Sequence, residues 1–97
     1  MFKLIALVTL KDGAPVEELL ARGREFLARE PTMLSWGLKA DAGHTQHYTL
    51  KPATFALLCE FNSADDWKRY LAGPIHEELN KLFTPWRTGA IGMQYDD

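Results

Sequence analysis

The chain of 97 residues has a single cysteine and almost no net charge, with a formal value of −2 at pH 7. A lone cysteine cannot form an internal disulfide, so a fold stapled by disulfides is excluded. Cys59 lies in an apolar run and is expected to be a buried thiol in the reducing cytoplasm. The absence of a basic excess, and of any lysine and arginine cluster interleaved with aromatic residues, argues against nucleic-acid binding.

Long apolar runs are also missing. No apolar stretch reaches the roughly 20 residues that cross a bilayer, so we expect no membrane association. The apolar N-terminal stretch lacks a small-residue cleavage site and leads straight into a turn, which favours a strand over a signal peptide. Histidine is scarce: His44 and His47 share a polar stretch but have no convergent Cys, Asp or Glu partner. We therefore predict neither a metal site nor a cofactor.

The sequence does contain enough apolar residues for one small domain spanning residues 1–97. Hydrophobic residues make up 46% and charged residues 25% of the chain, which is typical of a globular protein rather than a disordered one. The length fits a single domain. Because so short a chain buries only a modest core, association with a second copy is a common way to hide more apolar surface.

Apolar runs and alternation of apolar residues predict four strands. They are expected over residues 2–10, 33–40, 54–61 and 90–95. In the second strand the alternation places Leu34, Trp36, Leu38 and Ala40 on one face. In the last strand it places Ile91, Met93 and Tyr95 on one face.

Helix signals separate these strands. A first helix begins at Pro15 and is stopped by Pro31, and a second helical region is capped by Ser63, breaks at Gly73-Pro74 and ends at Pro85. The order β-α-β-β-α-β predicts an α+β, ferredoxin-like fold: a four-stranded antiparallel sheet with the helices on one face. Residues 41–53 are polar and long for a connection, so they form either a lid or an extension of the flanking strands.

The first and third strands are apolar on both faces, as Ile5 and Leu7 illustrate for the first. In the predicted fold the helices cover one face of the sheet, which leaves an apolar face open to water. Such a surface is rare in a monomer. We therefore predict a homodimer in which two sheets pack face to face about a two-fold axis.

The break at Gly73-Pro74 carries the residues that best suggest chemistry. Pro74 fits the first position of a helix, which puts His76 near the positive end of the helix dipole, where a neutral imidazole able to accept a proton is favoured. His76 shares a helix face with Leu79 and Phe83, so it points inward, and Tyr70 could face the same interior. The two side chains form either a proton-transfer pair or a pair of buried groups that only fill space.

Three stretches resemble a known family across essentially the whole chain. They are the first strand Lys3 to Asp12, the strand end Glu60-Phe61 and, most specifically, Tyr70-Leu71-Ala72-Gly73-Pro74-Ile75-His76. The sequence is similar to the stress-responsive dimeric α/β barrel (Dabb) family. That resemblance implies a ferredoxin-like protomer pairing sheet to sheet into a dimeric α+β barrel, in a family whose members mostly have no assigned reaction.

One plant branch of the family, similar to olivetolic acid cyclase, closes a linear polyketide by aldol condensation. The resemblance to that branch places its tyrosine at Tyr70 and its histidine, the general base, at His76, with Phe26 and Leu57 as apolar pocket walls. Leu4 and Phe55 stand where the cyclase has histidines, which implies a more apolar pocket with fewer polar contacts.

These considerations leave three functions open. The first is a homodimer of unassigned role that binds a small hydrophobic ligand between sheet and helices. The second is a polyketide cyclase-like enzyme using His76 as base and Tyr70 as hydrogen-bond donor. The third is a heme or monooxygenase member of the wider ferredoxin-like dimers, which requires a histidine placed as an axial ligand in a cavity.

Overall fold

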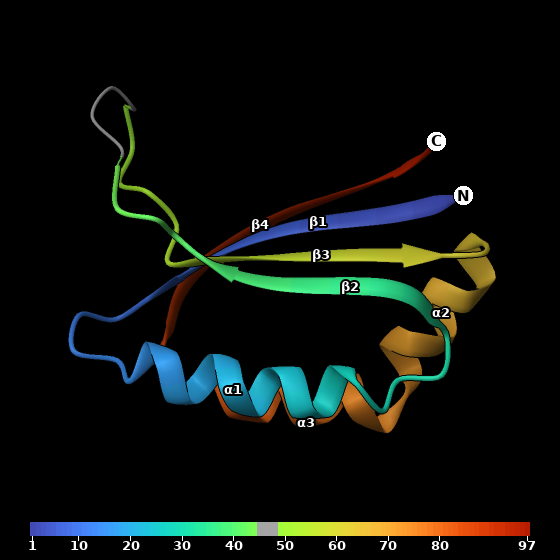
Figure 1. The fold of residues 1–97 in the computed structure, drawn as a ribbon, viewed down its shortest axis with the longest axis horizontal. Coiled ribbons are helices and arrows are strands. Elements are labelled where there is room, and N and C mark those ends of the chain that lie inside the picture. The colour runs from blue at the N-terminus through green and yellow to red at the C-terminus, as the bar shows by residue number, and fades with distance from the viewer. Residues whose placement is uncertain (45–48) are drawn as a thin grey trace.

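Four antiparallel strands form a twisted sheet, and the helices lie on one side of it (Figure 1). The structure is a computed structural model that describes residues 1–44 and 49–97. Its elements are β1 (Phe2–Leu10), α1 (Val16–Leu27), β2 (Met33–Ala40), β3 (Phe55–Phe61), α2 (Ala64–Ala72), α3 (Pro74–Phe83) and β4 (Arg87–Asp96). The strand order β2-β3-β1-β4 confirms the predicted ferredoxin-like topology.

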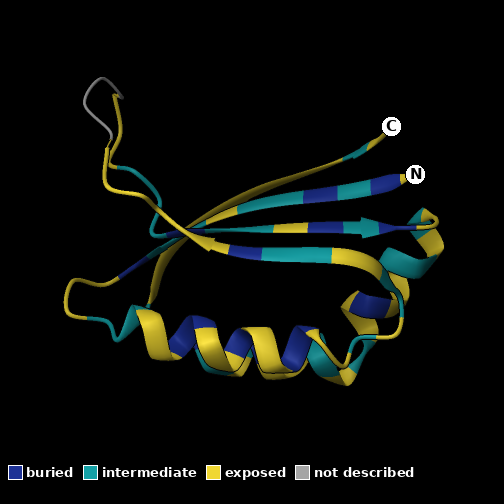
Figure 2. Ribbon diagram, viewed as in Figure 1, coloured by how far each residue is buried: buried dark blue, intermediate teal, exposed yellow. Residues whose placement is uncertain are grey.

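The core lies between the sheet and the helices. Even-numbered residues of β1 face odd-numbered residues of β3 on this side, in the register Phe2 to Phe61, Leu4 to Cys59, Ala6 to Leu57 and Val8 to Phe55. From α1 the core receives Leu19, Leu20, Gly23, Phe26 and Leu27. Figure 2 shows the buried residues on the sides of the helices that face the sheet, as expected for amphipathic helices.

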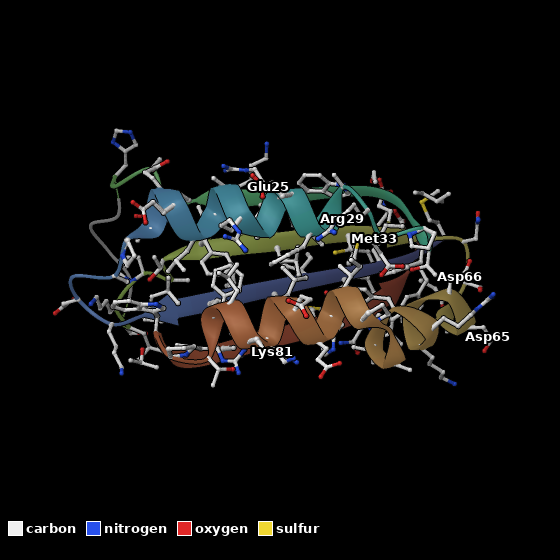
Figure 3. All side chains as sticks on the ribbon, turned by 90° about the horizontal axis from the view of Figure 1, so that it is seen from below. Glu25, Arg29, Met33, Asp65, Asp66 and Lys81 are labelled. Atoms are coloured by element: carbon white, nitrogen blue, oxygen red, sulfur yellow. The ribbon has the colours of Figure 1, made fainter. Side chains whose placement is uncertain are left out.

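Close packing of α1 on the sheet depends on Gly23. A Cβ atom added there would lie 2.8 Å from Cδ2 of Leu38 on β2 and 3.4 Å from Cζ of Phe83 on α3. The absent side chain therefore lets α1 approach both elements. In the view from below, α1 and α3 run side by side across the sheet (Figure 3). Their charged residues Glu25 and Lys81 are exposed.

One predicted strand face is wrong at its start. The pairing of β2 with β3 shifts register between Met33 and Ser35, so that Met33 lies opposite Phe61 and Ser35 opposite Glu60. Met33 consequently packs against the core, and Leu34 is exposed. Such a bulge inserts an extra residue into one strand, so the residues before it point to the opposite face from the one that alternation predicts. Only Trp36, Leu38 and Ala40 keep the expected face.

The other face of the sheet carries an apolar patch that no helix covers. It consists of Ile5, Leu7, Leu58, Ile91 and Met93, which the register places side by side on β1, β3 and β4. We call this set the open-face patch. Ile91 is 72% exposed and Met93 57% exposed. The predicted two-sided apolar character of the strands is confirmed.

Polar groups border the open-face patch at one end. Nζ of Lys3 lies 2.8 Å from Oδ2 of Asp97 and 3.6 Å from Oε2 of Glu60. The hydroxyl of Ser35 donates to Glu60. That hydrogen bond, assisted by Lys3, lowers the pKa of the Glu60 carboxyl, so Glu60 is ionised at neutral pH. The apolar patch is therefore limited by charge on this side.

The strand β4 is the least covered part of the sheet. All of its residues except Tyr95 are exposed. On the helix side its middle residues are small, namely Ala90 opposite Val8 and Gly92 opposite Ala6. The helices therefore leave most of this edge strand exposed.

None of the helices within residues 1–44 and 49–97 combines the length and apolar character needed to cross a bilayer.

The Cys59 thiol provides a test of the core. Burial raises its pKa from 9.0 to about 12, so at pH 8 the thiolate fraction should be roughly a thousandfold below that of an unshifted thiol. We expect the native protein to resist the thiol reagent DTNB at pH 8 and to react with one equivalent per chain in 6 M guanidinium chloride.

The variant Ala21→Cys, which adds a thiol at an exposed position of α1, is the positive control and should react with one equivalent at once. Fast reaction of Cys59 in the untreated native protein would show that this part of the core opens to solvent.

Candidate functional site

The Gly73-Pro74 break brings two helices together at an angle. Helix α2 ends at Ala72, Gly73 adopts an extended conformation, and its N–H donates to the carbonyl of Tyr70 at 3.0 Å. A Cβ on Gly73 would lie only 3.2 Å from the carbonyl oxygen of Arg69. Pro74 then starts α3 at once, in the position where a missing N–H costs nothing. The predicted break is therefore confirmed.

This turn places Tyr70 and His76 against each other. Their ring centroids lie 5.1 Å apart with an interplanar angle of 71°, an edge-to-face contact. In the described part of the chain no hydrogen bond joins the two side chains directly. The two side chains are therefore in contact but do not form a preformed proton relay.

Tyr70 is held by the aromatic core. It is 2% exposed, and its ring lies 5.8 Å from that of Phe61. Burial, the largest cause, raises the pKa of the phenol well above its usual value, with the nearby Cys59 and Glu30 adding to the effect. Tyr70 is therefore a neutral hydrogen-bond donor at any physiological pH.

A cavity of about 240 Å³ opens next to this pair, between the sheet and helices α2 and α3. Its apolar walls include Leu4, Ala6, Val8, Leu27, Leu38, Phe55, Leu57, Leu79 and Phe83. Five of the six predicted site residues line it together: Tyr70, His76, Leu4, Phe55 and Leu57.

The sixth, Phe26, is not among the residues that line the cavity. It is buried on α1, where the guanidinium groups of Arg22 and Arg29 lie 5.6 Å and 5.3 Å from its ring centroid. The two guanidinium groups lie over the ring in cation–π contacts. The structure therefore places Phe26 in the core of α1, apart from the other five residues.

Three further polar side chains line the cavity that the sequence did not single out: Asn80, Arg87 and Gln94. Asn80 could have been found, because it lies one helical turn after His76 on the same face of α3. Gln94 lies opposite Leu4 in the register, on the face of β4 away from Met93 and Tyr95. No Asp or Glu lines the cavity within the described residues.

Trp67 adds an unused donor to this wall. Its indole ring packs on Phe2, with centroids 5.3 Å apart, while Nε1 is buried and has no hydrogen-bond partner in the described structure. Buried donors are normally paired, so the indole N–H is available to a hydrogen-bond acceptor that enters the cavity.

His44 is not among the residues that line the cavity. His44 is exposed, and His47 lies outside the described residues. Within residues 1–44 and 49–97 no three His, Cys, Asp or Glu side chains gather closely enough to hold a metal ion.

Comparison with solved structures supports the fold. A dimeric ferredoxin-like protein of unknown function from Thermobifida fusca has a TM-score of 0.84 at 20% identity, covering 99% of this chain and 90% of that one. A dimeric protein of unknown function and ferredoxin-like fold from Bacteroides fragilis has a TM-score of 0.73 at 23% identity, covering 99% and 95%. A hydroxynitrile lyase from Passiflora edulis has a TM-score of 0.79 at 20% identity, covering 97% and 90%.

At these identities the likeness establishes the fold alone. Comparison with curated proteins gave no match. A family model does match: the stress-responsive A/B barrel domain (Dabb) covers residues 2–96. The predicted resemblance is thereby confirmed over nearly the whole chain, and the protein belongs to the stress-responsive A/B barrel (Dabb) domain family.

Proposed function

We propose that this protein is a homodimer, paired through the open-face patch, that binds a small hydrophobic ligand in the cavity beside Tyr70 and His76. The observation that carries the proposal is the cavity itself. It is an apolar space, and its polar lining residues remain available to bind a ligand. Binding sites for small molecules have this character, with mostly apolar walls and a few placed polar groups.

The size of the cavity limits the ligand. Drug-sized pockets start at roughly 300 Å³, and the volume here is about 240 Å³. An engineered apolar cavity of about 150 Å³ holds benzene. The ligand should therefore be a molecule of one or two rings, or a chain of similar bulk.

Pairing through the open-face patch is supported by its composition and by the relatives. Exposed apolar groups on three adjacent strands form one contiguous surface, and large patches of this kind mark interaction sites. The ferredoxin-like proteins from Thermobifida fusca and Bacteroides fragilis are dimeric. A second copy supplies the same apolar surface, which a two-fold interface requires.

The dimer is tested by placing a charge in the centre of the patch. Ile91→Asp buries an unpaired carboxylate in the interface, a substitution that costs several kcal/mol. We expect the wild-type protein to sediment as a dimer at micromolar concentration and Ile91→Asp as a monomer.

Leu50→Asp is the matched control, because Leu50 is 81% exposed and lies in the connection between β2 and β3. It should remain dimeric. A monomeric wild-type protein, or a dimeric Ile91→Asp variant, would contradict pairing through this face.

The cavity is tested by filling it. Ala90 is an exposed residue of β4 that lines the cavity, so Ala90→Phe should occupy part of the space without disturbing the buried core. We expect the affinity for the neutral two-ring probe 2-naphthol, measured by fluorescence titration, to fall at least tenfold.

Ala40→Phe makes the same change at an exposed position of the opposite edge strand, which is not part of the cavity lining, and should bind 2-naphthol as the wild type does. Equal loss in both variants, or no binding by any of the three proteins, would oppose a ligand site here.

A second candidate function is a polyketide cyclase-like enzyme. It is favoured by the edge-to-face contact of Tyr70 and His76 at the cavity wall. In this mechanism the neutral imidazole removes a proton next to a carbonyl group, while the phenol donates a hydrogen bond to the oxygen on which negative charge develops. The likeness to a hydroxynitrile lyase supports an enzyme only at the level of a shared fold.

The enzyme is tested with linear β-polyketo substrates. General-base catalysis contributes about 10² to 10⁴ in rate, so His76→Ala should reduce turnover by that factor, and Tyr70→Phe, which removes only the hydroxyl, should reduce it as well. Both variants should remain folded by circular dichroism.

His44→Ala removes an exposed histidine and should keep full turnover. Turnover that survives His76→Ala, or its absence in the wild type across the substrate panel, would leave ligand binding as the remaining proposal.

A further inference from the structure

We propose that the cavity selects a carboxylic acid with an unbranched apolar chain, whose carboxylate meets Arg87 and whose chain extends toward Tyr70 and His76. This inference rests on the proposed function, because it names the ligand class of the same cavity. It depends on the shape of the cavity and on the position of its charge.

The cavity is elongated along the sheet. One end is marked by Gln94, opposite Leu4, and the other by Arg87, opposite Leu10. Six strand residues at about 3.4 Å each separate these positions by roughly 20 Å. A chain fits this length better than a compact ring system does.

The helices follow the same direction. Tyr70 packs on Phe61, which lies opposite Phe2 at the start of β1. Phe83 packs on Phe55, with ring centroids 4.8 Å apart, and Phe55 lies opposite Val8 farther along β1. The Tyr70 and His76 pair therefore lies at one end of the cavity, and Arg87 follows Phe83 at the other.

Charge at the two ends differs. Arg87 is the only lysine or arginine lining the cavity in the described part of the chain, and no carboxylate lines it. The guanidinium group has one long hydrogen bond, 3.5 Å to Oγ1 of Thr84, and no ion pair within residues 1–44 and 49–97. Lys81, by contrast, is paired with Glu77.

An unpaired guanidinium beside an apolar space favours an anion with an apolar body. The planar guanidinium group matches the two oxygens of a carboxylate. A cationic ligand would meet repulsion from Arg87 without a compensating acid, and a neutral ligand would leave the guanidinium unused. Because Arg87 is exposed, the selection should be moderate.

The test compares three probes with the same eight-carbon chain: octanoate, 1-octanol and octylammonium. Each is titrated against the dimer at pH 7.5 and low salt, by displacement of 2-naphthol and by calorimetry. We expect octanoate to bind about five- to tenfold more tightly than octanol, and octylammonium to bind most weakly. The preference should shrink at 0.5 M NaCl, because salt screens exposed charges.

The variant Arg87→Gln should bind octanoate and octanol equally, with the affinity for octanol unchanged. Arg22→Gln, which removes a surface arginine of α1 that pairs with Glu25, should keep the wild-type preference. Binding of octanol as tight as octanoate, or a preference that survives Arg87→Gln, would overturn the assignment of Arg87 while leaving the ligand site intact. Failure of all three probes and of 2-naphthol would overturn the ligand site as well.

Discussion

A β-sheet with apolar residues on both faces must be covered on both faces, and this chain has helices for only one of them. Helices α1 and α3 lie on one side of the sheet. Phe55 and Cys59 are buried on that side, whereas the register places the exposed Ile91 and Met93 on the other. Burial of apolar surface is the main favourable term in folding and in association alike. The same hydrophobic effect therefore stabilises the core within one chain and, in the dimer that we propose, covers the remaining face with a second copy.

The cavity follows from incomplete packing between α3 and β4, whose residues line it together. Gly23 lets α1 pack close to β2, while the small residues Ala90 and Gly92 on the helix side of β4 leave space at the other edge of the sheet. The break at Gly73-Pro74 places the end of α2 and the start of α3 beside this space. The cavity exists because packing is incomplete at one edge of the sheet, whereas the core around it is close-packed.

Much of this arrangement could be predicted from the sequence because it depends on local patterns. Apolar runs predicted the first and third strands, alternation predicted the faces of the last strand, and Pro74 determined where a helix restarts. The exposed Leu34 could not be foreseen, because the bulge depends on how β2 pairs with β3. Arg87 was missed for a similar reason: its place in the cavity requires knowing that the end of α3 lies beside the start of β4. Phe26 was assigned to the pocket wall from a resemblance, whereas its position on the buried face of α1 places it in the core.

The exposed edge of β4 has a consequence of another kind. Edge strands present unpaired amide and carbonyl groups. Natural proteins prevent other chains from pairing with these groups by placing charges or proline along the strand. Between Arg87 and Asp96 this strand has neither. A single protomer thus presents an apolar face and an edge without charge or proline on the same strand, and together these favour aggregation. If the proposed dimer forms, its dissociation and self-association into larger particles are therefore coupled, and dilution should lower the solubility of the protein.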